Sequence, residues 1–262
     1  MRENGDARIN LDQYYELMDL LSKFSGIGYE VRRQKDFNSQ FNISVILKAI
    51  IAQREMIVPM LDPRYGNLRM RVACESCGLT DKNGINNIYH EDEIESFCPN
   101  HGWFSTSIDD ESGRFEYNTP LRNLIRALAY SQQNADLGNP NEILRITGSD
   151  YAGFYQEQLL YKVASRLGYP AHELPAIVYA PLILDWSGAK LSKSLYVKEG
   201  AYKYLPEYLI NYEKFSELLG ESGIRVLFDE VSSWLDEPYR LFRHYSVYYF
   251  MELLNEKFGL EK

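Results

Sequence analysis

Three cysteines and one histidine have the spacing of metal ligands. Cys74 and Cys77 stand in "CESC", and Cys98 and His101 stand in "CPNH" after an interval of twenty residues. Each pair places two ligands on one tight turn, and two such turns can surround a tetrahedral Zn²⁺ ion. Four protein ligands leave no coordination position open, so we expect a structural zinc site. The alternative is two ordinary turns with buried cysteines, and His90 is a spare ligand whose spacing fits less well.

A second chemical pattern is the segment "KLSKS", in which Lys190 and Lys193 alternate with Ser192 and Ser194. It follows the apolar run "PLIL" and a turn with Gly188, which leaves the backbone free to close. Ammonium groups and hydroxyls on such a loop suit a triphosphate, because they can neutralise pyrophosphate as it leaves. The alternative is a solvated surface loop.

The sequence "TGSD", which contains Gly148 and Asp150, follows another strand-like run, "EILRI". A helical pattern then leads to the run that precedes the lysines, so the order strand, helix, strand predicts a parallel pair. Ligands bind at the carboxyl ends of such strands, and we expect both polar segments to face one crevice. The alternative for Asp150 is an N-cap of the helix that follows.

Taken together, these segments resemble class I aminoacyl-tRNA synthetases, closest to the lysyl and glutamyl types, over residues 11–215. "KLSKS" is similar to the family's "KMSKS" loop, "RITGSDYAGF" to its Gly-x-Asp turn, and the zinc pattern to an insertion of the lysyl type. The resemblance implies formation of an aminoacyl-adenylate from an amino acid and ATP with Mg²⁺, and transfer to tRNA. It implies that Lys190 and Lys193 are catalytic. The implied ATP-binding residues are Gly148, Asp150, Lys190, Ser192, Lys193 and Ser194.

The family's second signature, His-x-Gly-His or His-x-Gly-Asn, is missing. The four histidines are His90, His101, His172 and His244, and none precedes Gly and then His or Asn. We therefore expect the chain to lack the N-terminal part of the catalytic domain that bears this signature. It is then a fragment, or a partner chain supplies the missing half, or it is a repacked paralogue without activity. An inactive binding protein and a nucleotidyltransferase acting on a small metabolite are the alternative functions.

The expected fold class is α/β, with a partial Rossmann-like parallel sheet, a zinc-knuckle insertion and a helical C-terminal region. The N-terminal part of the α/β domain is expected at residues 1–67 and the insertion at 68–118. The α/β half that carries the lysine loop is expected at 119–200, and the helical region at 201–262.

Three runs predict the strands that position these motifs. They are "IGYEVRRQ" at 27–34, "EILRITG" at 142–148 and "AIVYAPLILD" at 176–185, the last apolar throughout and therefore expected to be buried. A helix is predicted over 151–168, where Gly168 provides the C-cap.

Composition limits the classes of function. The chain has 262 residues and a net charge of −9, so it disfavours binding of nucleic acid over its whole surface, and tRNA is a partner that the charge does not support. No apolar run approaches the roughly 20 residues that span a bilayer, and the first residues lack the apolar core of a secretory signal. We expect a cytoplasmic protein without membrane contact.

Overall fold

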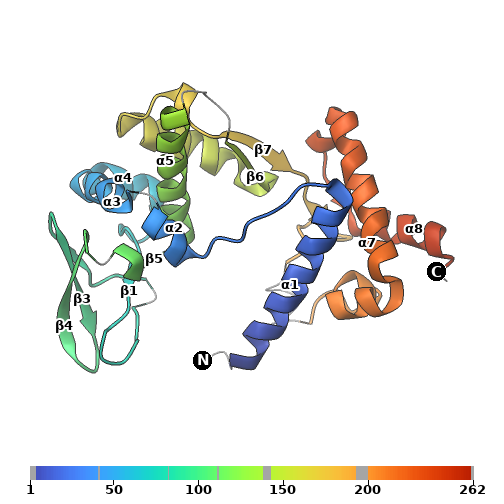
Figure 1. The fold of residues 1–262 in the computed structure, drawn as a ribbon, viewed down its shortest axis with the longest axis horizontal. Coiled ribbons are helices and arrows are strands. Elements are labelled where there is room, and N and C mark those ends of the chain that lie inside the picture. Colours follow the sequence, from blue (N-terminus) through green and yellow to red (C-terminus); the bar gives the residue numbers. More distant parts are fainter. Residues whose placement is uncertain are drawn as a thin grey trace. The chain divides into compact units, whose positions relative to one another are not determined.

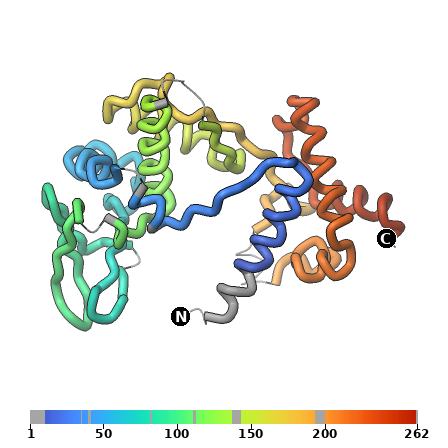
Figure 2. The backbone as a smooth tube through the Cα atoms, in the orientation of Figure 1, coloured from blue at the N-terminus to red at the C-terminus, as the bar shows by residue number. Residues whose placement is uncertain are grey.

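The structure, a computed structural model, describes residues 4–40, 42–81, 83–110, 112–137, 143–192 and 200–260. The chain forms two compact units: a central unit of residues 31–178 and a terminal unit made of residues 1–30 and 179–262. Figure 1 labels the main helices and strands of both units, and Figure 2 follows the backbone through them. Each unit has a hydrophobic core of its own.

Helix α5 (Thr119–Leu137) forms the centre of the central unit. Its residues Leu124 and Leu128 are completely buried. The helix contacts α3 (Ile43–Ala52) and η3 (Phe154–Ala164), whose apolar side chains are buried in the same core. Each fully buried leucine or isoleucine contributes about 1.5–3 kcal/mol to folding, so these three helices dominate the stability of the unit.

Two shorter helices, α2 (Gln34–Gln40) and α4 (Arg54–Leu61), complete the helical layer of the central unit. Gln53, with φ −107° and ψ 20°, separates α3 from α4. Phe37 on α2 and Ile57 on α4 are both buried, so each short helix is held by its contribution to the core.

The β-structure of the central unit begins with two antiparallel sheets. One pairs β1 (Met70–Val72) with β5 (Phe115–Tyr117). The other has the order β2-β3-β4, with strands Ile88–Tyr89, Glu93–Cys98 and Gly102–Ser107. The 3-10 turn η1 (Ser112–Arg114) leads into β5.

The three-stranded sheet has one buried face and one exposed face, because side chains alternate along a strand. Ile94 and Thr106 lie opposite each other and are completely buried. Phe97 and Trp103 also lie opposite each other, on the other face, where they are 38% and 53% exposed. The buried face is therefore small, and the sheet needs further support.

The last part of the central unit confirms the strand predicted over 142–148 and the helix predicted over 151–168. Strand β6 (Leu144–Gly148) is followed by the short turn η2 (Ser149–Tyr151) and by η3, which has π-type turns. A further turn, η4 (Ala171–Glu173), leads to β7 (Ala176–Ala180), and β7 pairs with β6.

The terminal unit is largely helical. Helices α1 (Asn4–Ser25), α7 (Tyr212–Asp236) and α8 (Val247–Phe258) surround a core of Phe215, Leu219, Ile224 and Leu254. Gly220, at φ 52° and ψ −148°, interrupts α7. The smaller elements are β8 (Ile183–Leu184), η5 (Glu207–Leu209), η6 (Pro238–Phe242) and β9 (Tyr245–Ser246), and β8 runs parallel to β9.

Two strand predictions need correction. Residues 27–33 form no strand: Ile27 is 70% exposed, and no neighbouring strand accepts the hydrogen bonds of this segment among the described residues. The apolar run at 176–185 is divided at Pro181, whose nitrogen cannot donate to a strand ladder. Its two parts, β7 and β8, pair with different strands and are half-buried.

The fold class is mixed α/β, as expected, but the expected sheet is not found. The sheets of the described residues contain two or three strands each, and a Rossmann-like parallel sheet is not among them. Among the same residues, no helix combines the length and the apolar character needed to cross a bilayer.

Replacing Gly84 with alanine is expected to destabilise the protein by about 2–4 kcal/mol. Gly84 adopts φ +57°, and a Cβ atom there would lie 1.9 Å from the carbonyl oxygen of Met70. Gly153→Ala is the matched control, because Gly153 is helical, its surroundings are open, and alanine favours a helix. Urea unfolding followed by circular dichroism measures both variants. Equal stability of the two would contradict the close approach of the 84 loop to β1.

Candidate functional site

Two turns of the central unit bring the four predicted metal ligands together. Cys74 and Cys77 lie in the loop after β1, while Cys98 is the last residue of β3 and His101 lies in the turn before β4. The antiparallel register pairs Cys98 with Gly102, so the β3–β4 turn presents Cys98 and His101 on one side. The structure thus places all four predicted ligands in a single group.

The distances within this Cys3His group fit one metal ion. The Cys77 and Cys98 sulfurs are 3.6 Å apart, and the His101 Nδ1 atom lies 3.5 Å from the Cys74 sulfur and 3.6 Å from the Cys98 sulfur. A tetrahedral ion bonded at about 2.3 Å to sulfur and about 2.0–2.1 Å to nitrogen places its ligand atoms about 3.5–3.8 Å apart. The four side chains are therefore arranged around a space of the size that an ion needs.

The sulfur atoms are free thiols, and their separation excludes a disulfide. A disulfide bond is about 2.05 Å long, whereas Cys77 and Cys98 stay 3.6 Å apart. Cys74 is 4% exposed and Cys98 is 1% exposed. Cys77 is exposed. Two buried sulfurs and one exposed sulfur that lie together without a bond are suited to a shared cation.

The electrostatics of Cys98 favour its metal-binding form. Burial acts to raise the pKa of Cys98, but hydrogen bonds from the Asn100 backbone, His101 and Cys77 lower it overall to about 6. The thiolate, which is the form that ligates metals, is therefore the main species at neutral pH. Because this pKa lies below the usual value, the thiolate is lost only as the pH falls through about 6.

The neighbouring sulfurs also shift the pKa of Cys77. The Leu79 backbone N–H acts to lower the pKa of Cys77, but burial and the side chains of Cys98 and Cys74 raise it overall. Opposed shifts of this kind arise when two thiols share one site and only one ionises readily. A bound cation would remove this opposition, because its charge stabilises every thiolate around it.

The backbone of the first turn holds its two cysteines in place. The Cys74 N–H donates to the Leu79 carbonyl oxygen at 2.9 Å, and the Gly78 N–H donates to the Cys74 carbonyl oxygen at 2.8 Å. Arg114 adds a side-chain tie, because its Nη2 atom donates to the Ala73 carbonyl oxygen at 3.0 Å. The ligands therefore sit on backbone that is closed by hydrogen bonds.

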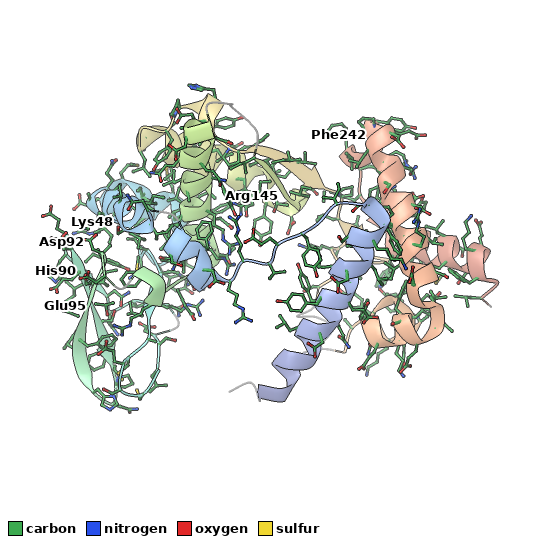
Figure 3. All side chains as sticks on the ribbon, in the orientation of Figure 1. Lys48, His90, Asp92, Glu95, Arg145 and Phe242 are labelled. Atoms are coloured by element: carbon green, nitrogen blue, oxygen red, sulfur yellow. The ribbon has the colours of Figure 1, made fainter. Side chains whose placement is uncertain are left out.

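Lys48 ties the three-stranded sheet to the helical layer. Its Nζ atom, on α3, donates to Asp92 and Asp109 at 2.6 Å each, and these residues lie in the turns at one end of the sheet. The two carboxylates, Asp109 first, raise the pKa of Lys48 well above its usual value. Figure 3 labels Lys48 and Asp92. This contact fixes the end of the sheet opposite to the Cys3His group.

His90, the spare ligand, does not belong to the Cys3His group. Its Nε2 atom lies 3.1 Å from Glu95 Oε1, and Figure 3 labels both residues. With Glu93 they form a second, exposed cluster of ligand atoms on the outer face of the sheet. The choice of His101 rather than His90 as the fourth ligand is therefore supported by the geometry.

The predicted ATP-binding residues lie in both units. Gly148 ends β6 and Asp150 lies in η2, so both belong to the central unit. Lys190 and Ser192 belong to the terminal unit. Lys193 and Ser194 lie outside the described residues. The two segments are described within their own units, so the shared crevice remains a prediction.

The lysine segment begins at a tight turn that is closed by one carboxylate. Asp185 Oδ1 accepts from the Ser187 N–H at 2.8 Å, the Ser187 hydroxyl at 2.7 Å and the Ala189 N–H at 3.1 Å. These bonds, led by the Ser187 hydroxyl, hold the pKa of Asp185 below its usual value. Gly188 adopts φ +81°, which a glycine tolerates best. Lys190, which follows this turn, forms an isolated antiparallel β-bridge with Leu184 on β8.

Sequence reasoning missed a group of arginines in the central unit. Arg122 and Arg126 lie one helical turn apart on α5, and Arg145 on β6 bonds to Asn123 between them. The signal in the sequence is the i, i+4 spacing of two arginines in "TPLRNLIRALAYSQQNA", which contains no acidic residue. The contribution of Arg145 comes only from the fold.

No known protein family, curated protein sequence or solved structure matches this chain.

Replacing His101 with alanine is expected to remove the bound metal and lower the melting temperature, because one of four ligands is lost. His90→Ala is the control and should keep the metal, since His90 lies outside the Cys3His group. Metal content by plasma mass spectrometry and thermal unfolding test both variants. Metal should also be released on acidification, because protons compete with the metal for the thiolates. A His101→Ala protein with full metal content would contradict the assignment.

Proposed function

We propose that this chain is a zinc-binding, class I aminoacyl-tRNA synthetase-like protein that activates an amino acid with ATP. Zinc is the metal proposed for the Cys3His group, because thiolates and imidazole in a tetrahedral arrangement suit Zn²⁺. With four protein ligands the ion has no open position, so its role is to hold the fold of the 68–118 segment.

The observation that carries this proposal is the turn at Asp185. It ends β8, reverses the chain through Gly188 and delivers Lys190 directly after a strand. The Leu191 N–H donates back to the Ile183 carbonyl oxygen at 2.9 Å, so the chain on both sides of the turn is fixed. A strand, a closed turn and then the first lysine is the arrangement that the resemblance to the family's phosphate-binding loop requires.

A second hydrogen bond holds the chain immediately before Lys193. The Ser192 N–H donates to the Tyr202 hydroxyl oxygen at 2.9 Å. Tyr202 is 5% exposed and packs with Leu205 and Val247 in the terminal unit. Ser192, the last described residue before Lys193, is therefore tied to the core that contains Tyr202. Such anchoring supports a role in which the amines must meet charge at a defined place.

In the proposed reaction, a carboxylate oxygen of the amino acid attacks the α-phosphorus of ATP. The bond from that phosphorus to the bridging oxygen breaks, and pyrophosphate leaves with the bond electrons. Lys190 and Lys193 neutralise the charge that develops on the pyrophosphate, while Ser192 and Ser194 donate hydrogen bonds to it. The nucleophile comes from the substrate, so the chain supplies positioning and charge. The acyl group then passes to tRNA.

A binding protein is the second candidate function. The observation that favours it is the aromatic pair on the outer face of the three-stranded sheet. The Phe97 and Trp103 ring centroids lie 5.3 Å apart in an edge-to-face arrangement, and both side chains are exposed. Large aromatic side chains next to a structural metal site are typical of an interaction surface, and this candidate requires no activity.

Exchange of labelled pyrophosphate into ATP by the purified chain is expected with a single amino acid. Lys193→Ala and Lys190→Ala should each lower the exchange rate about 100-fold or more, because each removes a charge that meets the transition state. Lys257→Ala is the control, since Lys257 lies exposed in the last turn of α8. The assay is run with each amino acid in turn.

Two results would redirect the proposal. Pyrophosphate release without any amino acid would favour the nucleotidyltransferase alternative. A complete absence of exchange, with unchanged folding of the lysine variants, would favour the binding protein.

A further inference from the structure

Three arginines of the central unit converge on one side of α5. Arg122 and Arg126 lie on the helix, and Arg145 reaches it from β6. The Arg145 Nη2 atom donates to Asn123 Oδ1 at 2.8 Å, which fixes Arg145 between the other two along the helix. Figure 3 labels Arg145. Residues four apart on a helix are neighbours, so the three guanidinium groups form one cluster, here called the arginine cluster.

Neutral groups hold each member of the arginine cluster. Arg122 Nη2 donates to Thr119 Oγ1 at 3.3 Å, and Arg126 Nη2 donates to Gln34 Oε1 at 3.1 Å. Arg145 Nη2 also donates to the Tyr155 hydroxyl oxygen at 2.9 Å. Within the part of the chain that the structure describes, none of the three forms an ion pair with a carboxylate.

The cluster brings three arginines without a carboxylate partner together. Some single arginines of the described residues, such as Arg54 and Arg243, also donate to neutral groups. Five others pair with a carboxylate: Arg69 with Asp62, Arg71 with Glu116, Arg114 with Glu75, Arg225 with Asp229, and Arg240 with Glu230. Three positive charges without such a partner repel one another. The cluster therefore lacks the negative charge that would balance it.

Aromatic rings support two of the guanidinium groups. Arg126 lies 5.7 Å from the centroid of the Phe37 ring, and Arg145 lies 4.6 Å from the centroid of the Tyr155 ring. A ring beneath a guanidinium plane fixes its orientation and leaves its edge donors directed sideways. These arginines are preorganised rather than free to turn toward distant carboxylates.

Some donors of the cluster are buried and have no acceptor. Arg145 Nη1 and Arg122 Nε are both buried without a hydrogen-bond partner. Buried donors are nearly always satisfied in folded proteins, by protein, water or a ligand. Partial burial, followed by the positive charges of Arg122 and Arg145, also lowers the pKa of Arg126. An anion at the accessible edges of these half-buried side chains would relieve the repulsion.

We propose that Arg122, Arg126 and Arg145 bind a phosphate group of a phosphorylated ligand. Guanidinium groups bind phosphate oxygens through charge-assisted, often paired hydrogen bonds, and phosphate offers more acceptor oxygens and more charge than a carboxylate. The phosphate belongs either to a small phosphorylated molecule or to the backbone of a nucleic acid. The site is separate in residues from the lysine segment and does not depend on the proposed amino acid activation.

The test measures binding in protein that carries Lys190→Ala and Lys193→Ala, so that the lysine segment contributes nothing. Calorimetry with inorganic pyrophosphate probes the small ligand, and fluorescence anisotropy with a short RNA lacking terminal phosphates probes a backbone. At least one probe is expected to bind. Arg126→Gln should weaken that binding about tenfold or more, since one charge-assisted contact is lost. Arg166→Gln is the matched control, because Arg166 is an exposed arginine of the same unit.

The results distinguish a small phosphorylated ligand from a nucleic-acid backbone and test the proposal. Binding of pyrophosphate alone identifies a small phosphorylated ligand, and binding of RNA alone identifies backbone phosphates. If thermal unfolding shows that Arg126→Gln does not fold, Arg122→Gln provides the same test. Among the described residues, the Arg122 side chain donates only to Thr119. Binding of neither probe overturns the proposal. Equal effects of Arg166→Gln and the cluster variants overturn it as well, because any loss of charge would then suffice.

Discussion

The three-stranded sheet of the central unit depends on one cluster, the three sulfurs and one imidazole that meet between the loop after β1 and the β3–β4 turn. The sheet that carries this turn has strands of two to six residues and one exposed face, so its own core is small. Short sheets of this kind are marginal without support. Two further constraints help: Lys48 holds the opposite end, and Ile94 fills the buried face. A cation bound by the Cys3His group would add support, because it would join two segments that are distant in sequence.

Structure could be predicted from the sequence where the residues of one segment determine it by themselves. The metal-ligand group follows from the spacing of Cys74 and Cys98 with their neighbours, and β6 and η3 follow from hydrophobic periodicity. The strand expected at 27–34 was wrong because a strand exists only with a partner, and the sequence does not reveal which segment is adjacent. The run at 176–185 was divided because one proline outweighs the strand preference of its neighbours. The arginine cluster was missed because Arg145 joins it only in the folded chain.

The chain carries its cationic sites inside an acidic surface. With a net charge of −9, it repels phosphates in general, and only places where cations gather can overcome this repulsion. The lysine segment and the arginine cluster are two such places, with different physical character. Ammonium groups are strongly hydrated and adapt in position, whereas guanidinium groups resting on aromatic rings have fixed directions. An acidic background with few cationic sites favours selective recognition over broad adhesion.

The hydrogen bond from Ser192 to Tyr202 has a consequence for how the lysine segment tolerates change. The donor is the main-chain N–H, so the bond does not depend on which side chain occupies position 192. Evolutionary drift at that position can alter the hydroxyl chemistry without detaching the segment from its support, and only proline would remove the donor. Tyr202 itself is less replaceable: its φ of 71° is strained for a residue with a side chain, and the surrounding core holds it there. The side chain at position 192 can therefore change without loss of this bond, whereas Tyr202 supplies both the acceptor oxygen and a buried ring.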